Sequence, residues 1–100
     1  MNSKELVSLQ ESLLGYFYNA IENLESLIQS GEKIIDTLNK KSRNEYESKD
    51  NSLQAILTLN WERNIDQLRA TLKRLKKIII QEERRLHKLT EYSERMEEVP

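Results

Sequence analysis

Apolar residues recur at alternating steps of three and four through the first 40 residues, and this spacing restricts the segment to a long helix. One row occupies positions 6, 13, 20, 27 and 34, with residues 17, 24 and 38 at the other half of the seven-residue repeat. The spacing holds for about five repeats. It predicts an amphipathic helix over about 4–40, which we expect to begin after Ser3 as its N-cap.

A second apolar row lies directly beside the first. Each member follows a member of the first row by one position: Val7, Leu14, Ile21, Ile28 and Ile35. Three apolar positions per repeat form a face that is too wide for a single partner helix to cover.

Turn-forming residues are scarce, which argues against a sheet. The chain has 100 residues with two glycines, and its one proline is the last residue, Pro100. Sandwiches, barrels and βαβ folds need Gly- and Pro-rich corners between strands. We therefore expect an all-α fold and, at this length, a single domain over 1–100.

A polar segment separates the first helix from a second. Residues 39–52 read NKKSRNEYESKDNS, so we place one turn within 40–52. Ser42 and Glu45 have capping-box spacing, and Asp50 and Ser52 are later alternative starts, so the second helix runs from 45 or 52 to about 97. Its apolar row, which Glu82 interrupts, comprises Leu53, Leu57, Trp61, Ile65, Leu68, Leu72, Leu75, Ile79, Leu86, Leu89 and Met96.

One turn between two long helices predicts an antiparallel, coiled-coil-like hairpin. Folding about residue 46 places Gly31 opposite Trp61, where the missing side chain would make room for the indole ring. The alternative is that Gly31 kinks the first helix. The same register lets the acidic tail, residues 91–99, project beyond the first helix. The expected hairpin core comprises Leu13, Phe17, Leu24, Leu27, Gly31, Trp61, Ile65, Leu68 and Leu72.

The wide face of the first helix predicts a partner. Two helices leave one apolar stripe uncovered, and monomers rarely expose such a stripe to water. We therefore expect a three- or four-helix bundle, completed by a second copy or by another helical protein. The expected partner interface comprises Val7, Leu14, Tyr18, Ile21, Ile28 and Ile35.

The sequence has no pattern that indicates catalysis or a metal site. It has no cysteine and one histidine, His87, and it lacks the paired Glu-x-x-His motifs of di-metal bundles. Phosphate-binding loops and nucleophile elbows are also missing from the sequence. We expect a protein that is not an enzyme and that binds no cofactor and no metal.

Basic residues are concentrated in the second helix, although the net charge of the chain is −1. Between positions 63 and 88 there are nine basic residues and three acidic ones. This face could bind the phosphates of nucleic acid, contact an acidic protein, such as the acidic first helix of another copy, or simply be solvated. It comprises Arg69, Lys73, Arg74, Lys76, Lys77, Arg84 and Arg85.

These observations favour a non-catalytic protein-interaction module, working as a scaffold, adaptor or chaperone subunit. The alternative is a nucleic-acid-associated helical protein that uses the basic face over 63–88. No apolar run reaches the roughly 20 residues that a membrane span needs, and we expect an intracellular location, cytoplasmic or nuclear. Binding to a membrane surface is a third hypothesis, which the acidic first helix disfavours.

Overall fold

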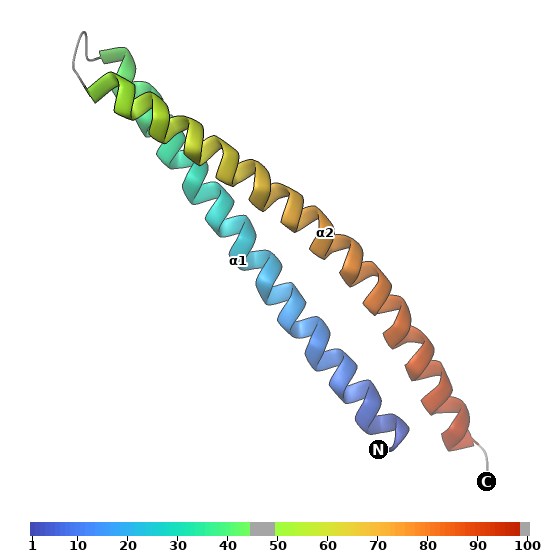
Figure 1. Ribbon diagram of the computed structural model, residues 1–100. Helices are drawn as coiled ribbons and strands as arrows, with labels where there is room; N and C mark the ends of the chain where they lie inside the picture. Colours follow the sequence, from blue (N-terminus) through green and yellow to red (C-terminus); the bar gives the residue numbers. More distant parts are fainter. Residues whose placement is uncertain (45–49, 99–100) are drawn as a thin grey trace. The chain divides into compact units, whose positions relative to one another are not determined.

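The computed structural model describes the backbone of residues 1–44 and 50–98 and the side chains of residues 1–40 and 52–97. It contains two helices, α1 (Ser3–Asn44) and α2 (Asp50–Glu98), which pack antiparallel against each other (Figure 1). The described residues form no strand, so the predicted all-α hairpin is confirmed. By its contacts the chain divides into unit 1, Met1–Glu22 with Lys73–Pro100, and unit 2, Asn23–Leu72.

The N-terminus of α1 is capped by Asn2. The backbone N–H of Glu5 donates a hydrogen bond of 2.8 Å to Oδ1 of Asn2, which satisfies one of the amides left free at a helix start. The predicted cap, Ser3, is instead the first helical residue, and its hydroxyl donates to Oγ of Ser93 at 3.2 Å. An Asn is as good a cap as a Ser, so composition alone did not distinguish them.

α1 is continuous through Gly31 and extends past residue 40 to Asn44. Ser42 therefore lies in the last turn of α1 and not at the start of the next helix. α2 begins at Asp50, one of the later starts that the sequence offered. Glu45 and Tyr46 lie outside the described residues.

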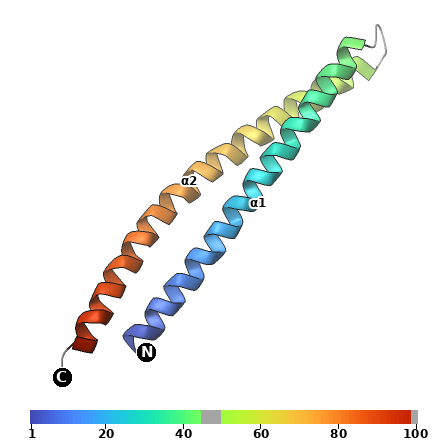
Figure 2. The ribbon, with the colours of Figure 1, turned by 180° about the vertical axis from the view of Figure 1, so that it is seen from behind.

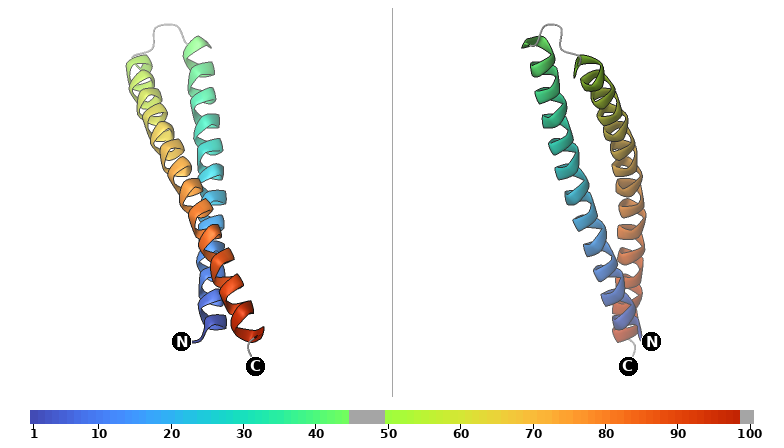
Figure 3. Two further views of the ribbon diagram at one scale, coloured as in Figure 1. Left: turned by 90° about the vertical axis from the view of Figure 1, so that its right-hand side faces the viewer. Right: turned by 60° about the vertical axis from the view of Figure 1, so that its left-hand side comes forward.

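Within each unit, α1 and α2 meet along a seam with heptad spacing. In unit 1 the first half of α1 runs beside the second half of α2 (Figure 2), and in unit 2 the remaining halves run side by side (Figure 3). We label the repeat a to g with Val7 and Ile65 at position a. The buried or half-buried seam positions, a and d, are Ser3, Val7, Gln10, Leu14, Phe17, Ile21, Leu24, Ile28, Gly31, Ile35 and Leu38 in α1, and Gln54, Thr58, Trp61, Ile65, Leu68, Leu72, Leu75, Ile79, Glu82, Leu86, Leu89 and Ser93 in α2.

The seam uses the second apolar row of α1 and not the first. Leu14 and Ile28 are buried, with 4% and 7% of their surfaces exposed, whereas Leu13 and Leu27 are 41% and 47% exposed. The assignment of Leu14 and Ile28 to an outer stripe, and of Leu13 and Leu27 to the core, was therefore wrong. The remaining members of the second row, Val7, Ile21 and Ile35, also lie on the seam and are half-buried.

The two rows are neighbours on the helix, about 100° apart, and both are apolar, so hydrophobicity alone did not choose between them. Ser3, Gln10 and Gly31 lie at position d, which accompanies either row, so they did not decide between the rows. Leu53 and Leu57 of α2 are exposed because the seam there uses Gln54 and Thr58.

The register of the hairpin also differs from the predicted one. A Cβ atom added at Gly31 would lie 2.9 Å from Cδ1 of Ile65 and 3.6 Å from Cε3 of Trp61, so Ile65 is the nearer neighbour. In unit 1 the end of α2 lies beside the start of α1, where Lys4 Nζ is 2.8 Å from Glu97 Oε1. The prediction that residues 91–99 project beyond the first helix was therefore wrong for the part up to Glu97.

Candidate interaction site

A polar layer interrupts the seam of unit 1. Glu82, which is 8% exposed, accepts a hydrogen bond of 2.6 Å at Oε2 from Nε2 of Gln10, and the same nitrogen lies 3.1 Å from the Glu82 carbonyl oxygen. Arg85 donates to Oε1 of Glu82 at 2.5 Å. Both oxygens of the buried carboxylate are therefore paired, which offsets the cost of removing its charge from water.

One flank of the seam carries cross-helix polar pairs at position e, and we call it the e side. In unit 1 it contains the Lys4–Glu97 ion pair and a hydrogen bond of 2.8 Å from the Tyr18 hydroxyl to Oε1 of Glu83. In unit 2 Arg69 Nη2 lies 2.5 Å from Oε1 of Glu32. Pairs at e positions contribute to the alignment of antiparallel helices, although each exposed pair adds little stability.

Two of these pairs shift the pKa of their donor. The hydrogen bond to Glu83, with a smaller contribution from burial, raises the pKa of the Tyr18 hydroxyl above 10.0. The hydrogen bond and the charge of Glu97 raise the pKa of Lys4 above 10.5. In both cases the carboxylate favours the protonated form of its partner.

A shallow groove of about 480 Å³ lies on the e side of unit 1 and contains the single histidine. Nε2 of His87 is 2.9 Å from Oε1 of Glu91, one turn further along α2. Within the described residues, no group of three or more potential ligands is arranged to hold a metal ion. The groove is lined by Glu11, Leu14, Tyr18, Glu83, Leu86, His87 and Thr90.

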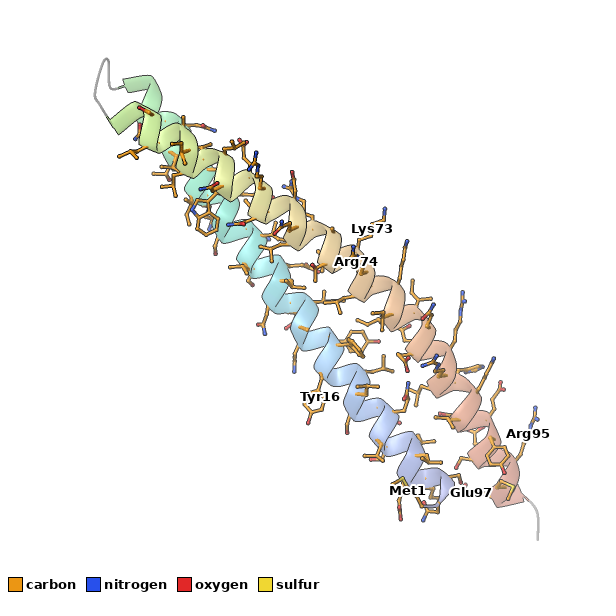
Figure 4. The ribbon with its side chains drawn as sticks, viewed as in Figure 1. Met1, Tyr16, Lys73, Arg74, Arg95 and Glu97 are labelled. Carbon is orange, nitrogen blue, oxygen red and sulfur yellow. The ribbon has the colours of Figure 1, made fainter. Side chains whose placement is uncertain are left out.

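The opposite flank of the seam, which we call the c/g side, exposes apolar side chains from both helices in unit 1. On α1, Leu6 and Leu13 occupy position g, and Leu9 and Tyr16 occupy position c. Tyr16 is 73% exposed and projects away from α2 (Figure 4). On α2, Ile78 and Tyr92 occupy position g and are also exposed. A second groove shows that both helices contribute to this side; it is lined by Met1, Asn2, Ser3, Leu6, Leu89, Tyr92 and Met96.

The c/g side of unit 2 is uncharged among the residues with described side chains. Leu27 and Ile34 of α1 and Leu53 and Leu57 of α2 are its exposed apolar members. The other c and g positions there carry neutral polar side chains: Asn23, Ser30, Thr37, Asn60, Asn64, Gln67 and Thr71.

Acidic residues are excluded from the c/g side along the described side chains of both helices. Over 1–40 and 52–97, every Asp and Glu occupies position b, d, e or f. Because the 100-residue chain has 17 Asp and Glu residues, this exclusion is a strong asymmetry between the two flanks. It leaves in each unit one acid-free flank with exposed apolar side chains and one flank that is rich in acidic and paired residues.

The basic residues that the sequence singled out have different surroundings. Arg69 pairs with Glu32 and, at 3.7 Å, with Asp66, and Arg85 pairs with Glu82. Within the chain, Arg69 is thus paired with acidic residues of both helices, whereas a contact of the basic face with another copy stays a prediction. The other members form no ion pair within the described part of the chain; they are Lys73, Arg74, Lys76, Lys77 and Arg84.

The sequence anticipated an uncovered apolar stripe but placed it on the wrong flank. Of the predicted interface residues, Tyr18 is exposed, yet it lies on the e side and is hydrogen-bonded to Glu83. The exposed stripe contains Leu13 and Tyr16, and it also contains α2 residues that no sequence argument selected. The sequence does contain a signal for the correct flank, namely the lack of acidic residues at positions c and g. This lack becomes visible when the seam is assigned to the second apolar row, one residue after the first.

Comparisons with known proteins do not place the chain in a family. No family model matches it, and no curated protein and no solved structure matches it significantly. Among the described residues, neither helix is long and apolar enough to cross a membrane.

Proposed function

We propose that the chain is a non-catalytic helical interaction module, a scaffold, adaptor or chaperone subunit, that self-associates or forms part of a larger helical assembly. The observation that carries this proposal is the acid-free c/g side of each unit, which leaves leucine and isoleucine side chains exposed. Helices bury such a stripe against other helices when they form three- and four-helix bundles.

The energetic argument concerns the leucines and aromatic residues of this side. Leu6, Leu13 and Leu27 each leave more than 40% of their surface exposed, and Leu9 and Tyr16 leave more than half. Each square ångström of apolar surface removed from water contributes about 25 cal/mol, so covering several such side chains supplies a large part of the free energy of association.

Sedimentation equilibrium over a concentration series tests the proposal, with matched variants to locate the surface. Leu9→Ser removes an apolar side chain that is 56% exposed at position c, and Ile80→Ser removes one that is 51% exposed at position b. If the chain self-associates, we expect Leu9→Ser to weaken the association. If it is a folded monomer, we expect Leu9→Ser to weaken the binding of an apolar dye. Ile80→Ser should change neither quantity. A folded monomer that binds no dye and responds equally to both variants would contradict the proposal.

A second candidate function, binding to nucleic acid, is favoured by Lys73, Lys77 and Arg84 of α2, which have no ion pair in the described part of the chain. Lys73 projects away from α1 (Figure 4). Binding to phosphates weakens steeply with salt because counterions are released. A titration of duplex and single-stranded oligonucleotides at two salt concentrations tests it; no binding at low salt eliminates this candidate.

A further inference from the structure

The c/g side of unit 1 is asymmetric in charge. Its centre is formed by the g positions of both helices, with Leu6, Leu13 and Ala20 from α1 and Ile78, Arg85 and Tyr92 from α2. Its two edges are the c positions. The α1 edge carries Leu9 and Tyr16, whereas the α2 edge carries Arg74, Lys88 and Arg95. Tyr16 points away from Arg74 and Arg95 (Figure 4).

The cations of the α2 edge are available to a ligand. Arg74, Lys88 and Arg95 are exposed and form no ion pair within the described residues. Arg85 of the central row is paired with Glu82, but its side chain remains 68% exposed. The surface therefore combines an apolar centre, one apolar and aromatic edge, and one basic edge without compensating acids.

We propose that the c/g side of unit 1 binds an acidic amphipathic helix of another protein, which adds a third helix to the pair. The inference rests on the proposed function and specifies the chemistry of the partner. The partner helix places an apolar stripe on Leu6, Leu13 and Tyr92, in the manner of helix-in-groove recognition. Its acidic flank faces Arg74, Lys88 and Arg95, and its opposite flank contacts Leu9 and Tyr16.

Charge argues against a second copy as the occupant. A symmetric dimer brings the same patch of both subunits together, so each basic edge would meet an identical surface that contains no acidic residue. Like charges brought together at an interface cost free energy and suppress that pairing. An acidic helix instead gains from each cation of the edge.

The distribution of charge also disfavours a lipid or nucleic-acid surface. A helix pair that lies flat on anionic lipid benefits from cations on both edges, but the α1 edge of unit 1 has none. A phosphate backbone would leave the leucines of the central row uncovered. Both surfaces are nevertheless included as outcomes of the test.

The experiment uses the full chain and synthetic helical peptides of 21 residues. The first peptide has leucines at a and d and glutamates at e and b. The second replaces the glutamates by lysines, and the third keeps the composition of the first in a scrambled order. Fluorescence anisotropy of labelled peptides measures binding at two salt concentrations, and vesicles with anionic lipid and a duplex oligonucleotide serve as competitors. We expect only the first peptide to bind.

Matched charge variants locate the binding surface without disturbing the seam. The triple variant Arg74→Gln, Lys88→Gln, Arg95→Gln removes the basic edge. Its control, Lys73→Gln, Lys77→Gln, Arg84→Gln, removes the same charge at positions b and f. Each exposed ion pair contributes about a twofold change in affinity, so we expect the first triple variant to bind the acidic peptide about eightfold more weakly and the control to change little.

The outcomes separate this inference from the proposed function. Equal binding of the acidic and basic peptides, or equal effects of the two triple variants, would overturn the acidic-helix proposal. Self-association that Leu9→Ser disrupts would also overturn it, while supporting an interaction module. A further outcome is that the vesicles or the oligonucleotide displace the acidic peptide from the edge formed by Arg74, Lys88 and Arg95. That result would assign the surface to lipid or to nucleic acid instead.

Discussion

Gly31 and Gly15 both lie inside α1, yet only one of them has a neighbour that a side chain would meet. A Cβ atom at Gly31 would lie 2.9 Å from Cδ1 of Ile65, whereas nothing lies within 4 Å of a Cβ atom at Gly15. Ile65 is 2% exposed, so it has little room to move aside. The same residue type therefore has a packing role at one position and none at the other.

We expect Gly15→Ala to stabilise the chain by about 0.5–1 kcal/mol, the usual gain from replacing a helical glycine. Gly31→Ala brings the same gain in helix stability but crowds Ile65, and such overpacking costs about 1–3 kcal/mol. We therefore expect the Gly31→Ala variant to be less stable than the Gly15→Ala variant by at least about 1 kcal/mol. Urea unfolding at a fixed protein concentration measures both. Adding Ile65→Val, which removes Cδ1, should restore part of the loss in the Gly31→Ala background; equal stabilities of the two alanine variants would contradict this account.

The Tyr18–Glu83 hydrogen bond has a consequence at alkaline pH. In the folded chain, Glu83 raises the pKa of Tyr18 above its ordinary value of 10.0. The hydrogen bond therefore stabilises the folded chain below pH 10, and this stabilisation is lost as the pH rises through the folded-state pKa of Tyr18. We expect Glu83→Gln to lower the pKa of Tyr18. Titration of tyrosinate absorbance, with Tyr18→Phe to assign the signal, measures the shift. An unchanged Tyr18 titration in Glu83→Gln would show that the bond is not formed in solution.

At the scale of the helix pair, the sequence predicted the elements well and their contact face poorly. Heptad spacing and the lack of internal proline were enough to predict two long helices. The choice between the two adjacent apolar rows of α1 depended on how α1 packs on α2, which buries Leu14 and Ile28. Apolar periodicity does not report which residues of the two helices lie opposite each other, and so the register was missed by one turn: Ser3 lies beside Ser93, and Gly31 lies beside Ile65.

The Gln10–Glu82 layer gives a testable prediction for the helix pair. Gln10→Leu leaves one oxygen of a buried carboxylate without its partner, and we expect it to destabilise the chain by about 1–3 kcal/mol. Adding Glu82→Leu removes the orphaned charge and extends the apolar seam, so the double variant should recover the loss or exceed the wild type. A double-mutant cycle in urea measures the coupling. Additive effects of the two substitutions would show that the two side chains do not interact.

At the scale of the whole molecule, acidic residues are sorted by flank, in addition to the concentration of basic residues in α2. A net charge of −1 gave no sign of this arrangement, which appears only when each residue is assigned to a helical position. The fold class followed from length, spacing and composition. The location of the exposed apolar side chains depended on which of two adjacent rows is buried, so it required the packing of α1 on α2.

Two opposing effects of salt should nearly cancel in the stability of the whole chain. Salt weakens exposed pairs such as Lys4–Glu97 and Glu32–Arg69, each of which adds little stability. It also screens repulsion among unpaired cations such as Lys73 and Lys77. We expect the unfolding free energy to change by less than about 1 kcal/mol between 0.05 and 1 M sodium chloride. A larger loss would mean that the ion pairs of the e side hold the helices together.

The buried Glu82 also limits how the helix pair can transmit information. Some two-helix proteins carry a signal by sliding one helix along the other between registers of similar energy. In unit 1 a slide of one repeat would place Glu82 beside Phe17 in one direction, and Gln10 beside Leu75 in the other. Either slide leaves a buried polar group against an apolar side chain. The Gln10–Glu82 layer of unit 1 therefore disfavours a slide of one repeat in either direction.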